Sequence, residues 1–147
     1  MVSLLIAYGS WSGNTKEVAE LIEGHLTEAG IDVTLYRIGV GEPIPDVRSF
    51  DAFMIGTFTW GKGVTPSLVK NFIADVGFKP PLVYVFGTGD TQFGGDELFC
   101  SAAVKLAHFY HSPLEPLRIE QSPRGSQEEI VKEWAEKVIT HYRRNVH

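Results

Sequence analysis

The chain has 147 residues, of which 44% are hydrophobic and 21% are charged, proportions typical of one globular domain with a sizeable core. Thirteen Lys and Arg against eighteen Asp and Glu leave a net charge of −5, which argues against a general nucleic-acid binder. No apolar stretch approaches the roughly 18 residues of a membrane helix, the first residues lack the basic flank of a signal peptide, and the single cysteine excludes an internal disulfide. We therefore expect one cytoplasmic domain spanning residues 1–147 that binds neither nucleic acid nor membrane.

The first half of the chain alternates strand and helix patterns. Residues 2–8 are nearly all apolar, as in a strand covered on both faces, and a helical repeat then runs to a stop at Gly30. Residues 31–38 alternate apolar and polar, which predicts a half-exposed edge strand. A loop over residues 39–48 leads to a buried strand at 51–58. The apolar face of the helix consists of Val18, Leu21, Ile22, Leu26 and Ala29.

The second half continues the alternation. Pro66 opens a helix, a buried strand follows at residues 82–87, and a further helix leads to a short strand at 114–119. The last helix covers residues 126–144, and residues 126–129 predict a capping box at its start. The inward faces of the three helices are predicted to be Leu68, Val69, Phe72, Ile73 and Val76; Phe99, Ala102, Ala103, Leu106 and Tyr110; and Ile130, Val131, Trp134, Val138 and Tyr142.

Strict alternation of apolar strands with helices predicts an α/β fold, a doubly wound five-stranded parallel sheet with helices on both faces. Ligands of such sheets bind beyond the carboxyl ends of the strands. Three loops follow buried strands, at residues 9–15, 57–65 and 87–95, and all are rich in Gly, Ser, Thr and aromatic residues. We expect them to converge at one edge of the sheet.

The first loop, Gly-Ser-Trp-Ser-Gly-Asn-Thr at residues 9–15, runs directly into a helix. Free amides and the helix dipole make such a terminus an anion site, and the hydroxyls of Ser10, Ser12 and Thr15 add donors. The loop has no lysine of the kind that nucleotide-triphosphate loops require. It suits a phosphate monoester, and the alternative is a simple turn with a helix cap.

The other two loops each carry an aromatic residue flanked by glycine. Trp60 lies in the second loop and Phe93 in the third, and two such rings can stack on the faces of a planar ligand. Backbone amides from Thr88 to Asp90 would pair with polar ring edges. The alternative for Trp60 is that it merely covers the end of the sheet.

These motifs resemble the short-chain flavodoxin family over nearly the whole chain. Residues 10–15 resemble its phosphate loop, Thr/Ser-x-Thr-Gly-Asn-Thr, with Ser12 in place of Thr; residues 59–61 resemble its inner flavin loop, and residues 87–90, 93 and 99–100 its outer loop. The resemblance implies strand order 2-1-3-4-5, non-covalent FMN and single-electron transfer. It implies cofactor contacts from Ser10, Trp11, Ser12, Gly13, Asn14, Thr15, Phe58, Thr59, Trp60, Gly61, Lys62, Thr88, Gly89, Asp90, Phe93 and Cys100.

The chain departs from the family pattern where Phe93 replaces a common Tyr, where Lys62 replaces a common acid, and where residues 94–95 lengthen the outer loop. The expected function is a monomeric, low-potential electron carrier, not an enzyme, between a flavodoxin reductase and an acceptor enzyme. Alternatives are an accessory flavoprotein that helps assemble a ribonucleotide reductase metallo-radical centre, and a nicotinamide-dependent FMN reductase. We expect no catalytic residue, no metal site at His108 and His111, and a packed rather than reactive Cys100.

Overall fold

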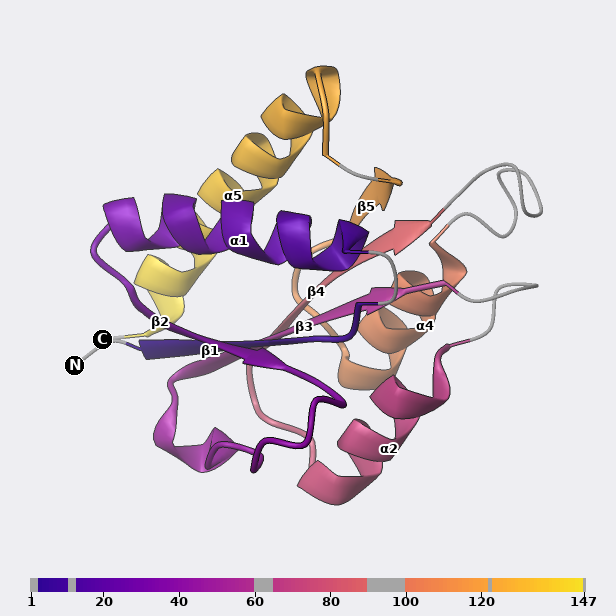
Figure 1. Cartoon of the computed structure of the whole chain (residues 1–147). Coiled ribbons are helices and arrows are strands. Elements are labelled where there is room, and N and C mark those ends of the chain that lie inside the picture. Colours follow the sequence, from indigo (N-terminus) through magenta and orange to yellow (C-terminus); the bar gives the residue numbers. More distant parts are fainter. Residues whose placement is uncertain (1–2, 11–12, 60–64, 90–99, 122, 147) are drawn as a thin grey trace.

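The fold is a single parallel sheet between two helical layers. The computed structural model describes residues 3–10, 13–59, 65–89, 100–121 and 123–146. Within them, five parallel strands pair in the order β2-β1-β3-β4-β5, which confirms the predicted fold (Figure 1). The strands are β1 (Ser3–Tyr8), β2 (Asp32–Arg37), β3 (Ala52–Phe58), β4 (Val83–Gly89) and β5 (Leu117–Glu120).

In the described part of the chain, two helices cover each face of the sheet. Figure 1 shows α1 (Asn14–Glu28) and α5 (Ser126–Asn145) on one face, and α2 (Ser67–Val76) and α4 (Ser101–Tyr110) on the other. Because successive side chains of a strand point to opposite faces, β1 contributes to both hydrophobic cores. Leu4 and Ile6 pack in the core under α1 and α5, whereas Leu5 and Ala7 pack in the core over α2 and α4. The nearly continuous apolar runs in the sequence follow from this burial on both faces.

Four local predictions differ from the structure. Ile130 is 45% exposed, because the buried face of α5 follows Val131 and Val138, and one residue along a helix turns the side chain by about 100°. The helix begins after Gly125 without a side-chain cap, so the predicted capping box at residues 126–129 is wrong. The last strand starts at Leu117 rather than residue 114, directly after Pro116, which has no backbone N–H for a sheet ladder.

The fourth difference lies in the predicted loop over residues 39–48. A short 3-10 helix, η1 (Val47–Ser49), lies at its end, and the carboxylate of Asp46 accepts a hydrogen bond from the Arg48 amide at 3.1 Å. Residues 2 and 99, which were predicted to lie in a strand and a helix, fall outside the described residues. No helix in the described part of the chain has the length and apolar character needed to cross a bilayer.

Candidate functional site

The carboxyl ends of three neighbouring strands bring the three predicted loops to one edge of the sheet. Tyr8 of β1 pairs with Gly56 of β3, and Phe58 of β3 pairs with Thr88 of β4. The chain therefore leaves β1, β3 and β4 on the same side of the sheet (Figure 1). We call this side the carboxyl edge.

The start of α1 presents backbone amides and hydroxyls at the carboxyl edge. The Ser10 hydroxyl oxygen accepts hydrogen bonds from the Gly13 amide at 3.2 Å and the Lys16 amide at 3.4 Å. Gly13 holds φ at +95°, in the left-handed region where a side chain is disfavoured, and turns the chain into the helix. The first-turn amides of Asn14 and Thr15 have no acceptor within the helix by position, so this end of α1 offers neutral donors to an anion.

A pair of buried threonine hydroxyls joins the first loop to the third. Thr15 Oγ1 lies 2.9 Å from Thr88 Oγ1, and the two residues are 1% and 2% exposed. We call this pair the threonine bridge. It fixes the first turn of α1 against the end of β4, because a buried hydroxyl is costly to leave without a partner.

Thr59 joins the second loop to both neighbouring elements. Its amide donates to the Thr88 carbonyl at 3.1 Å, and its hydroxyl oxygen accepts from the Ala102 amide of α4 at 3.4 Å. One side chain thereby satisfies an amide in the first turn of α4 that has no acceptor within its own helix. The structure thus brings together eight of the predicted site residues, namely Ser10, Gly13, Asn14, Thr15, Phe58, Thr59, Thr88 and Gly89.

Cys100 is packed in the core rather than presented to solvent. Its side chain is fully buried, and Sγ lies 3.6 Å from the Gly87 carbonyl oxygen and 3.7 Å from that of Ile119. Burial is the main cause that raises the pKa of the thiol to about 12. The thiol therefore stays protonated and unreactive at neutral pH, as expected from the sequence.

Arg37 is a residue of this edge that was not predicted from the sequence. It ends β2, pairs with Tyr8, and extends Nη2 to within 3.5 Å of the Ser10 carbonyl oxygen. The Arg37 charge favours the ionised Tyr8 phenol, although burial has the larger effect and raises the pKa of Tyr8. The alternation in β2 was the available signal, since Val33 and Leu35 pack toward α1 and Arg37 follows them at the same spacing.

Seven of the predicted site residues lie outside the described residues, namely Trp11, Ser12, Trp60, Gly61, Lys62, Asp90 and Phe93. The described residues contain no group of three potential metal ligands. The absence of a metal site at His108 and His111 stays a prediction.

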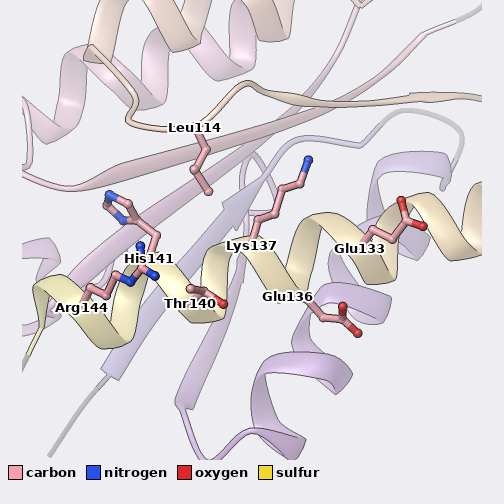
Figure 2. Close-up of a pocket in the computed structure, with 7 residues that line it drawn as sticks. All are labelled: Leu114, Glu133, Glu136, Lys137, Thr140, His141 and Arg144. Carbon is pink, nitrogen blue, oxygen red and sulfur yellow. The ribbon is translucent and has the colours of Figure 1, made fainter.

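A shallow depression on the outer side of α5 is separate from the carboxyl edge. Figure 2 shows it between α5 and the chain before β5, that is, near the amino end of β5. In this depression, the Nδ1 atom of His141 lies 2.7 Å from the hydroxyl oxygen of the buried Tyr84. Acidic and basic side chains both line it, so it has no consistent preference for a ligand charge. Its lining residues are Leu114, Glu133, Glu136, Lys137, Thr140, His141 and Arg144.

Comparison with known proteins gives concordant results. The family model described as Flavodoxin matches residues 6–134. Among curated proteins, the chain is 31% identical over 137 residues to a protein of Bacillus subtilis (strain 168) named probable flavodoxin 2, and the alignment covers 88% of this chain and 89% of that protein.

Two solved structures show the same fold. The oxidised flavodoxin 2 of Bacillus cereus is 30% identical and aligns over 95% of this chain and 99% of its own, with a TM-score of 0.80. A Fusobacterium nucleatum flavodoxin bound to flavin mononucleotide aligns over 96% of this chain and 99% of its own, with a TM-score of 0.70. At 15% identity, the second similarity shows the fold alone.

Proposed function

The chain belongs to the flavodoxin family, and from this premise we infer that it binds FMN and carries electrons between redox proteins. Three segments that resemble the family's flavin loops follow three neighbouring strands, and this convergence is the observation that carries the function. The match to the family model favours the carrier over the accessory flavoprotein and over the nicotinamide-dependent reductase. The flavin supplies the electron-transfer chemistry when it is bound, and the protein binds it, orients it and excludes water.

The donor set at the start of α1 fits a phosphate monoester. It consists of the backbone amides up to Thr15 and the Ser10 hydroxyl, together with Ser12 from the motif, and none of these groups carries a negative charge that would repel a phosphate. Hydrogen bonds to a charged acceptor each contribute about 1.5–3 kcal/mol. We propose that Ser10, Trp11, Ser12, Gly13, Asn14 and Thr15 hold the FMN phosphate.

The other two loops would hold the flavin ring. We propose that Trp60 and Phe93 stack on its two faces, and that the backbones of Gly61, Gly89 and Asp90 meet its polar edge. Thr59 supports this arrangement, because it connects the second loop to the Thr88 carbonyl and to α4. The remaining proposed neighbours of the flavin are Phe58, Lys62, Thr88 and Cys100.

The whole chain, residues 1–147, forms one FMN-binding domain in this proposal, and the match to residues 6–134 supports it. The protein acts as a monomer in the cytoplasm, takes electrons from a flavodoxin reductase and passes them to an acceptor enzyme. Family membership supports a carrier with no catalytic residue of its own.

Flavin titration of the purified apoprotein tests this function. We expect the protein to quench FMN fluorescence at one flavin per chain and to bind riboflavin more weakly. The FMN-loaded protein should not oxidise NADH or NADPH alone but should be reduced once a flavodoxin reductase is added. Failure of the apoprotein to bind FMN would overturn the proposal. Rapid oxidation of NADPH by the FMN-loaded protein without a reductase would identify an FMN reductase instead.

A further inference from the structure

Arg37 places a positive charge beside the loop that leads into α1. Its guanidinium contacts the Ser10 carbonyl, at the start of the loop that leads into α1. The N-terminus of a helix carries a partial positive charge, so a cation near it lowers stability. In the described part of the chain, this hydrogen bond is the polar contact that the structure gives Arg37, and no carboxylate forms an ion pair with it.

The strand geometry holds Arg37 at this place. Its backbone is fixed by pairing with Tyr8, and the next amide, that of Ile38, donates to the Tyr8 carbonyl at 2.8 Å. The side chain is half-buried, so its charge is less screened than that of a solvent-exposed arginine. Two acids on α1, Glu20 and Glu23, raise the pKa of Tyr8 by their negative charge, whereas Arg37 lowers it.

We propose that Arg37 supplies the positive charge that the neutral phosphate loop lacks, and that it thereby makes the protein select the phosphate ester of the flavin over the unphosphorylated flavin. This inference rests on the proposed function, because it concerns the same FMN phosphate. Arg37 is a specificity residue here, and its attraction acts on a ligand with two negative charges and hardly at all on a neutral one.

The test compares the dissociation constants of FMN and riboflavin for the apoprotein and for Arg37→Gln. We expect Arg37→Gln to weaken FMN binding on the order of tenfold at low ionic strength and to leave riboflavin binding nearly unchanged. The difference between the variant and the original protein should shrink at high salt, because ions screen the charge. Arg37→Lys should retain most of the FMN affinity.

Arg144→Gln is the matched control. It removes the same charge from the last turn of α5, two residues after Tyr142, whose hydroxyl donates to the Ser3 carbonyl at the start of β1. It should leave both affinities unchanged, which separates a local effect from a change in net charge. If circular dichroism shows that Arg37→Gln does not fold, Arg37→Met replaces it as the neutral variant.

Three outcomes would overturn the role of Arg37. They are equal losses of FMN and riboflavin affinity in the neutral variant, no loss of FMN affinity, or an equal loss in Arg144→Gln. Each of these leaves FMN binding by the unchanged protein intact. Failure of the proposed function is distinct, since the unchanged protein would then bind neither flavin.

Discussion

Two hydroxyl groups, those of Thr15 and Thr88, lie buried where most of the core is apolar. Their mutual hydrogen bond satisfies both and joins α1 to β4 across 73 residues of sequence. Removing one partner leaves the other buried without a hydrogen bond, whereas removing both leaves an apolar contact. The pair is therefore expected to be strongly coupled.

Valine substitutions at the threonine bridge should reveal this coupling. We expect Thr15→Val and Thr88→Val each to lower the free energy of unfolding by about 1–3 kcal/mol, and the double variant to lower it by clearly less than the sum. Urea denaturation of the original apoprotein, the two single variants and the double variant completes a double-mutant cycle. Additive effects would show that the two hydroxyls do not depend on each other.

Gly13 is the residue whose backbone conformation shapes the proposed phosphate loop. An added Cβ would meet no atom of the described residues within 4 Å, so a substitution there tests mainly the left-handed conformation. We expect Gly13→Ala to lower the free energy of unfolding by about 1–2 kcal/mol, measured in urea, and to weaken FMN binding more than riboflavin binding.

Gly24 provides the control for Gly13. It lies exposed within α1, with open space for a Cβ and no positive φ. Gly24→Ala should raise stability by about 0.5–1 kcal/mol, because alanine favours the helix. Similar effects of the two substitutions would contradict the role given to Gly13.

At the scale of elements, a glycine on β3 determines which side chain fits on the neighbouring strand β4. Gly56 pairs with Phe86, and a Cβ on Gly56 would lie 2.2 Å from the Phe86 ring. Phe86 is fully buried, so its ring has little room to move. The absence of a side chain at residue 56 thus makes room for a large one on the neighbouring strand.

Gly56→Ala should lower the free energy of unfolding by about 1–3 kcal/mol, because it forces Phe86 from its place. Thermal unfolding of the apoprotein measures the effect. Adding Phe86→Leu should cost less in the Gly56→Ala protein than in the original, since the smaller side chain relieves the clash. A fully additive pair would argue against the contact.

Hydrophobic periodicity predicted the elements well because most of them bury one or two faces. It located β1 and β4 by their burial on both faces and β2 by its half-exposed edge. Periodicity gave a wrong prediction where another interaction determines the local structure. Ile130 fits the spacing but lies outside the buried face of α5, and η1 depends on the Asp46 cap, which periodicity does not report.

The position of the three loops was predicted for a similar reason. Motif order and the rule for parallel sheets placed Ser10, Thr59 and Thr88 at one edge, because strand ends determine where loops begin. Arg37 was missed because it ends an edge strand and belongs to none of the three loops. The predicted strand order places β2 beside β1, but the contact with Ser10 depends on the register that pairs Arg37 with Tyr8, which a strand order does not specify.

At the scale of the whole molecule, buried weak acids should make stability fall at alkaline pH. Burial raises the pKa of the Cys100 thiol from 9.0 to about 12, and those of the Tyr110 and Tyr142 phenols from 10.0 to about 12. The unfolded chain loses these protons at lower pH than the folded chain. The stabilisation is therefore complete below about pH 9 and is lost as pH rises toward 12.

Urea unfolding of the apoprotein across this range checks the prediction. The unfolding midpoint should stay level up to about pH 9 and then fall. Cys100→Ala should reduce the fall above pH 9, because one of the three groups is removed, and a thiol reagent should label Cys100 only as the protein unfolds. A midpoint that does not change above pH 9 would contradict the assignment of these groups as buried.

The beginning and end of the described chain meet at the edge opposite the proposed flavin site. The Tyr142 hydroxyl in the last helix donates to the Ser3 carbonyl at the start of β1, at 3.3 Å. A linker attached near either end therefore leaves the molecule from the same side, away from the three loops (Figure 1). The protein can be immobilised on an electrode through such a linker with its flavin loops facing the solution, an orientation that leaves them accessible to a diffusing partner.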